Sequence, residues 1–148
     1  MFSLKVSTKG RYGIRLMLDL AIHYSKGLVT LKEIAIRQEI SEKYLEQIIM
    51  QLNKSDYVKS VRGSQGGYML AADPSAITVG AILRLMEGSL APVECVTGNN
   101  PSCNRAATCV TIGVWQKVKD AIENVVDNIT LADLVEEYYA KSSFDYVI

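Results

Sequence analysis

Three cysteines are the residues of this sequence whose type and spacing most invite chemistry. Cys95, Cys103 and Cys109 are separated by seven and then five residues, and the chain between the first two holds Gly, Asn and Pro. An odd number of cysteines is a poor basis for a disulfide framework, whereas a flexible loop lets several thiolates converge on one centre. The spacing leaves four interpretations open: inert buried thiols, a zinc site, a thiol redox switch or an iron–sulfur site. Because neither gap forms a Cys-x-x-Cys pair, zinc is somewhat less favoured.

A second pattern puts polar side chains on one face of a predicted helix that Ser41 can cap. The apolar face recurs at i, i+3, i+4 and i+7, through Leu45, Ile48, Ile49 and Leu52. The outward residues are Lys43, Tyr44, Glu46, Gln47 and Met50. In a DNA major groove, Gln47 could pair with adenine and Lys43 with guanine or a phosphate. The same residues would also suit the solvated face of any surface helix.

The residues after this helix change to a two-residue period, which predicts a β-hairpin with strands at 57–62 and 68–70. Arg62 stands at the mouth of its glycine-rich turn, where it could enter a DNA minor groove closely. The candidate contacts of this wing are Arg62, Gly63, Ser64 and Gln65. A nucleotide-binding phosphate loop is excluded, because the glycines lie between two strands and no Gly-Lys-Ser/Thr follows.

Polar residues at the start of the first predicted helix form a third candidate contact. Ser7, Thr8, Lys9 and Arg11 could hold phosphates there, or they could be an N-terminal cap with ordinary surface charges. Periodicity and capping residues place the other elements. The expected helices span residues 8–25, 31–38, 42–52, 79–87 and 109–128, with a short one after Thr130.

This order predicts a mainly α fold with a small β-hairpin: a winged helix-turn-helix domain plus a long dimerisation helix. We expect residues 1–88 to form the DNA-binding domain and 89–108 a cysteine-containing cluster loop. Residues 109–148 would then be the dimerisation helix and a short C-terminal helix. The apolar stripe of the long helix covers almost five turns, more than one small domain needs, and so favours a two-fold dimer.

Composition and charge agree with this organisation. With 49% hydrophobic and 22% charged residues, the chain is an ordinary globular protein. The net charge is zero, but residues 1–70 carry +5 and residues 71–148 carry −5, which suggests that one half approaches a polyanion. No apolar stretch is long enough for a membrane span and no secretory leader is recognisable, so a cytoplasmic location is expected.

Several motifs together resemble the IscR-like family of dimeric winged helix-turn-helix regulators, which also includes NsrR and CymR. The resemblance runs from about Ser7 to Glu137. The matching segments are Ser7–Tyr12, Tyr44–Gln47, Val61–Gly63 with Gly66–Tyr68, the three cysteines followed by Trp115, and Asn128–Leu131. The RGxxGGY wing after YLEQ is the specific part of this match.

The resemblance implies a palindrome-binding transcription regulator, acting as a repressor, whose DNA contacts include Lys43, Tyr44, Glu46, Gln47 and Arg62. It also implies dimerisation through the long helix and an iron–sulfur cluster, 2Fe–2S, held by the three cysteines. A cluster-free regulator of the CymR kind, controlled by a partner protein, is the alternative.

One departure from the family concerns the fourth cluster ligand. IscR-like proteins place a histidine three residues after the third cysteine, and here that position is Ile112. Other members ligate from the first helix with a carboxylate or a histidine, and the matching positions here are Arg11 and Arg15. The single histidine, His23, is expected to be structural, so the fourth ligand is unassigned.

An enzyme is not expected, because no Cys/His neighbourhood, paired-carboxylate motif or nucleotide fingerprint is present. A small iron–sulfur electron carrier would fit the cysteines, but it has no need for a wing or for a basic half.

Overall fold

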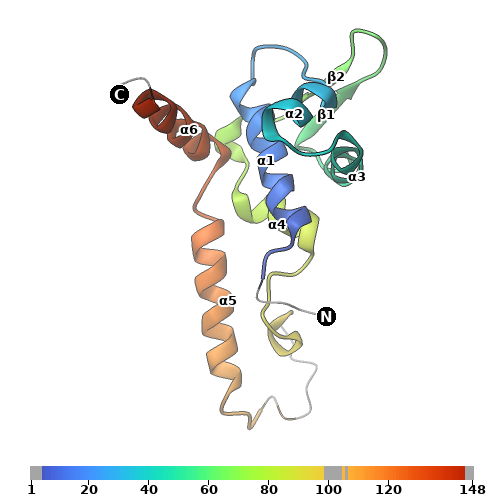
Figure 1. Ribbon diagram of the computed structural model, residues 1–148. Helices are drawn as coiled ribbons and strands as arrows, with labels where there is room; N and C mark the ends of the chain where they lie inside the picture. Colours follow the sequence, from blue (N-terminus) through green and yellow to red (C-terminus); the bar gives the residue numbers. More distant parts are fainter. Residues whose placement is uncertain (1–4, 99–104, 106, 146–148) are drawn as a thin grey trace.

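The computed structural model describes residues 5–98, 105 and 107–145, and its element order is that of a winged helix-turn-helix with a helical extension (Figure 1). Two strands pair as an antiparallel hairpin, β1 (Val58–Val61) and β2 (Gly67–Leu70), and short 3₁₀ turns lie at η1 (Pro74–Ala76) and η2 (Glu94–Val96). The helices are α1 (Thr8–Ile22), α2 (Leu31–Gln38), α3 (Glu42–Leu52), α4 (Val79–Glu87), α5 (Ile112–Val126) and α6 (Leu131–Asp145). The predicted fold class is confirmed.

Side-chain caps fix where most of these helices begin. Ser7, Ser41 and Thr78 each accept a hydrogen bond from the backbone N–H three residues later. At α2 the expected capping box is complete, because Thr30 accepts from the Glu33 N–H and the Glu33 carboxylate accepts from the Thr30 N–H.

The core lies around α1, which packs against α2, α3, α4 and α6. Leu16, Met17 and Leu20 are buried on α1, and the predicted inward face of α3 is buried in full. The four members of that face are Leu45, Ile48, Ile49 and Leu52. Because α3 is held by this apolar face, its opposite face is free to meet a ligand.

Helix α5 lies outside this core. None of its residues is buried, and in Figure 1 it extends away from the body beside the segment that carries η2, against which it packs. Its C-terminal end is tied to the body by a bridge between Thr78 and Thr130 and by a bidentate ion pair between Arg84 and Asp127.

Both expected boundaries of the long helix are wrong, and so is the expected end of the first helix. Helix α1 ends at Ile22 rather than 25, because the chain turns through Ser25 and Gly27, which both have positive φ. Helix α5 spans Ile112–Val126 rather than 109–128. A turn in which the Thr108 N–H donates to the Arg105 carbonyl precedes it, followed by the β-branched pair 110–111, which delays its start.

The last helix is not short: α6 has 15 residues. Its second half lacks an apolar stripe, and Glu, Ala and Lys, which are good helix formers, continue it. No helix among the described residues is long and apolar enough to cross a membrane.

Candidate functional site

The outward face of α3 is the best-formed candidate for a nucleic-acid contact. Lys43, Glu46, Gln47 and Met50 are exposed, and Met50 is 66% exposed although it is apolar. Within the part of the chain that the structure describes, no ion pair joins Glu46 to a neighbouring cation. The carboxylate is therefore free to accept a hydrogen bond from a ligand rather than being held by Lys43.

Tyr44 differs from its expected outward position, because its side chain is half-buried. Its ring stands perpendicular to that of Tyr12 on α1, with the centroids 5.7 Å apart. The two rings help to line an open hollow of about 320 Å³ between the start of α1 and the turn before α3. Sequence reasoning did not single out Tyr12, although it lies within the Ser7–Tyr12 segment that matched the family.

The hairpin turn is exposed and sharply bent. Arg62, Gly63, Ser64 and Gln65 are all exposed. Gly63 has φ +113°, and Gly66 donates its N–H to the Gly63 carbonyl at 3.0 Å. A Cβ added at Gly66 would overlap the carbonyl oxygen of Val61. Glycine is therefore required here, and the turn can approach a narrow groove closely.

Some of the polar groups at the start of α1 already form hydrogen bonds within the chain. The Ser7 N–H and hydroxyl both donate to Glu87 Oε1 of α4, and the hydroxyl also caps α1. The neighbouring Arg11 is exposed and donates to the Thr8 hydroxyl at 3.1 Å, while Lys9 is half-buried. Among these residues, Arg11 is the one most available to a phosphate.

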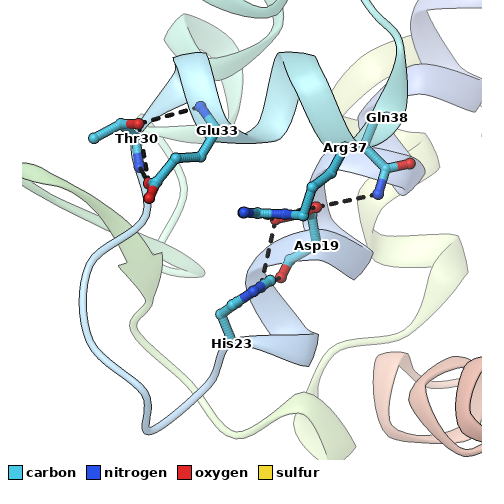
Figure 2. Close-up of polar contacts among 6 residues, drawn as sticks. All are labelled: Asp19, His23, Thr30, Glu33, Arg37 and Gln38. Atoms are coloured by element: carbon cyan, nitrogen blue, oxygen red, sulfur yellow. Dashed lines mark hydrogen bonds and ion pairs between the residues drawn. The ribbon is translucent and has the colours of Figure 1, made fainter.

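A buried carboxylate joins α1 to α2 (Figure 2). Asp19 of α1 is 1% exposed. Arg37 of α2 donates to both its oxygens, at 2.8 and 3.0 Å, and the Gln38 amide donates to one at 3.1 Å. This contact raises the pKa of the Arg37 guanidinium. His23 Nδ1 lies 2.8 Å from the Asp19 backbone carbonyl, so the expected structural role of this histidine agrees with its contacts.

The two described cysteines lie on neighbouring elements. Cys95 is in η2, which packs against α5, and Cys109 lies three residues before α5; both are half-buried. A hydrogen bond with the Thr111 hydroxyl, helped by the backbone of Thr111 and Ile112, lowers the pKa of the Cys109 thiol. A thiolate at this position is stabilised, and the thiolate is the form that binds metals.

Cys103 lies outside the described residues, as does most of the chain between the other two cysteines. Within the described residues, no group of three His, Cys, Asp or Glu side chains is arranged to hold a metal ion. Ile112, the first residue of α5, offers no lone pair. The donor chemistry at Cys95 and Cys109 fits an iron–sulfur cluster, and the fourth ligand is not found at Ile112.

Comparison with known proteins gives consistent matches over most of the chain. A family model described as Rrf2, iron-dependent transcriptional regulator, matches residues 6–137. The regulator CymR of Bacillus subtilis strain 168 is 41% identical over 131 residues, which are 88% of this chain and 89% of CymR. Its solved structure has a TM-score of 0.75 at 40% identity, covering 90% of this chain and 97% of that one. The structure of T. potens IscR has a TM-score of 0.74 at 51% identity, covering 90% and 88%.

Proposed function

Because the chain belongs to the Rrf2 family of transcriptional regulators, we propose that it is a homodimeric repressor that reads a palindromic DNA operator and senses iron–sulfur or redox status. The family is one of transcriptional regulators, not of enzymes. The observation that carries the proposal is the outward face of α3, which is polar and exposed while its apolar face is fully buried.

In this proposal α3 lies in the major groove and the hairpin turn lies in the flanking minor groove. Gln47 pairs with an adenine and Lys43 with a guanine or a phosphate, whereas Glu46 accepts from the N4 amino group of a cytosine. Arg62 enters the minor groove, where a narrow A/T-rich stretch has the strongest negative potential. Arg11 and Lys9 bind the backbone.

The dimer in this proposal forms through α5. Helices whose apolar stripe finds no partner in their own chain commonly bury it against another chain. Val114 and Val125 are 51% and 58% exposed, and Trp115, Val118 and Ile122 are only half-buried. A two-fold dimer carries two recognition helices, so its operator has two inverted half-sites. Sedimentation as a monomer at micromolar concentration would contradict this part of the proposal.

The sensing part of the proposal assigns the cluster to Cys95, Cys103 and Cys109. A bound 2Fe–2S cluster would supply a redox-active, iron-dependent centre. The chain's own contribution is to lower the pKa of the Cys109 thiol through Thr111 and to hold Cys95 on η2 against α5. The 51% identity to T. potens IscR supports this assignment.

A second candidate function keeps DNA binding and omits the cluster. It is favoured by Ile112, which replaces the histidine ligand expected from IscR-like proteins, and by the 41% identity to CymR. The B. subtilis protein is described as the global cysteine regulator, and in this alternative a partner protein rather than a cluster would control the chain.

Iron and sulfide analysis of anaerobically purified protein separates the two candidates. We expect a coloured protein with about two irons and two sulfides per subunit, and loss of the colour in the Cys95→Ala, Cys103→Ala and Cys109→Ala variants. Thr97→Ala is the matched control, because it changes the same loop without removing a thiol. Colourless wild-type protein that still binds its operator would favour the cluster-free candidate. A full-strength cluster in the Cys103→Ala variant would remove Cys103 from the site.

A further inference from the structure

Arg15 of α1 forms two hydrogen bonds with Gln38, the last residue of α2. Its Nε donates to Gln38 Oε1 at 3.2 Å, and a terminal nitrogen donates to the Gln38 backbone carbonyl. The amide nitrogen of Gln38 donates to the buried Asp19 carboxylate at 3.1 Å. Because the amide nitrogen is used by Asp19, the amide oxygen is fixed toward Arg15. The guanidinium is thus held in a defined place at the turn between α2 and α3.

The same guanidinium also lies over an aromatic ring. Arg15 Cζ is 5.3 Å from the centroid of Tyr12, one turn earlier on α1. Tyr12 is in turn edge-to-face with Tyr44, in the first turns of α3, at an interplanar angle of 90°. Guanidinium–ring and edge-to-face contacts both depend on orientation as well as on distance. A chain of contacts therefore leads from Arg15 through Tyr12 to α3.

These contacts hold both sides of the turn between the two helices. Arg15 forms hydrogen bonds with the end of α2, and the Tyr12 ring contacts Tyr44 at the start of α3. The intervening Glu39 has φ +55°, a left-handed conformation that is unfavourable for a glutamate by itself. We propose that Arg15 and Tyr12 are positioning residues for DNA recognition: they set the orientation in which α3 presents Lys43, Glu46 and Gln47. This inference rests on the proposed DNA-reading function.

Two other roles for Arg15 have different consequences. A phosphate contact would lower affinity for every DNA sequence when the charge is removed. A purely structural role would lower stability and leave the preference among sequences unchanged. A positioning role alone lowers affinity for the operator while leaving affinity for other DNA nearly intact, because only base contacts need exact placement.

Arg15→Lys is the decisive variant, because it keeps the charge but loses the planar guanidinium with its two-donor fork. Dissociation constants are measured at one salt concentration for the best sequence that wild-type protein selects from random DNA, and for a scrambled duplex of equal length. We expect the ratio of the two affinities to fall about tenfold, mostly through weaker operator binding. Tyr12→Leu should lower the ratio similarly, whereas Tyr12→Phe, which keeps the ring, should not.

The matched control is Ile77→Val, which truncates a fully buried side chain far along the sequence from α3 and should lower stability without changing the ratio. An unchanged ratio in Arg15→Lys would overturn the inference, as would an equal loss on both duplexes. A loss on both duplexes in Tyr12→Phe would instead assign the Tyr12 hydroxyl to a phosphate. If wild-type protein itself shows no preference, the proposed DNA-reading function fails, and the inference fails with it.

Discussion

Two arginine–carboxylate pairs in this molecule are both bidentate but differ in burial. Arg37 binds Asp19 through two hydrogen bonds of 2.8 and 3.0 Å, and Arg84 binds Asp127 through two of 2.6 and 2.9 Å. The arginine side chains are 37% and 40% exposed, but the carboxylates are 2% and 38% exposed. Replacing each arginine with alanine therefore tests mainly what burial of the carboxylate contributes.

Arg37→Ala leaves a charged carboxylate in the core, which typically costs about 3–5 kcal/mol. Asp19 keeps the Gln38 amide and the nearby His23 as partners, so we expect the lower end, about 3 kcal/mol. Arg84→Ala removes a solvent-screened pair and should cost about 0.5 kcal/mol. For a chain of this size the two losses correspond to falls in Tm of about 6–12 °C and about 1–2 °C.

Urea denaturation at one fixed protein concentration measures both losses, since a dimer's stability depends on concentration. The rescue variant is Asp19→Asn combined with Arg37→Ala, which removes the unpaired charge and should regain part of the lost free energy. Equal losses for Arg37→Ala and Arg84→Ala would refute the reasoning, and so would an absence of rescue.

Three further changes have defined outcomes. Arg62→Ala should weaken DNA binding and relax the preference for A/T-rich flanks; binding equal to wild type at about 150 mM salt would exclude the wing as a contact. Thr111→Val should raise the pKa of Cys109, seen as a shift to higher pH in its alkylation by iodoacetamide in metal-free protein; an unchanged profile would contradict the assigned cause. The Thr30 hydrogen bonds lower the pKa of Glu33 in the folded state, so its stabilising contribution is present above the unfolded-state value and is lost as the pH falls through the folded one. Glu33→Gln should therefore lose less stability than wild type between about pH 6 and about pH 3, and parallel losses would contradict this.

The elements that sequence reasoning placed correctly have strong local signals. The capping box at Thr30 and Glu33, the Ser41 cap and the 3/4-spaced face of α3 each specify a helix without reference to the rest of the chain. The turn at Arg62 to Gly67 also follows from its own glycines. These signals are sufficient for the fold class and for the outward face of α3 apart from Tyr44.

The features that sequence reasoning missed depend on contacts between elements. The half-burial of Tyr44 follows from Tyr12, 32 positions earlier in the chain, and the Arg15–Gln38 contact joins residues 23 apart. Nothing local distinguishes Arg15 from the exposed Arg11 one turn earlier. The start of α5 lies three residues after the predicted one, because a turn that the apolar pattern does not reveal precedes the helix.

Selection of bound sequences from random DNA by wild-type protein and by the Glu46→Ala variant tests the central claim, that the exposed face of α3 reads an operator. Phosphates repel a carboxylate, so Glu46 should lower affinity for most sequences and favour those with a suitably placed cytosine. We predict that wild type enriches an imperfect palindrome, and that Glu46→Ala enriches a wider set in which discrimination at one base pair per half-site falls by about 1–3 kcal/mol. Recovery of the same motif by both proteins, or of no motif by wild type, would contradict the account.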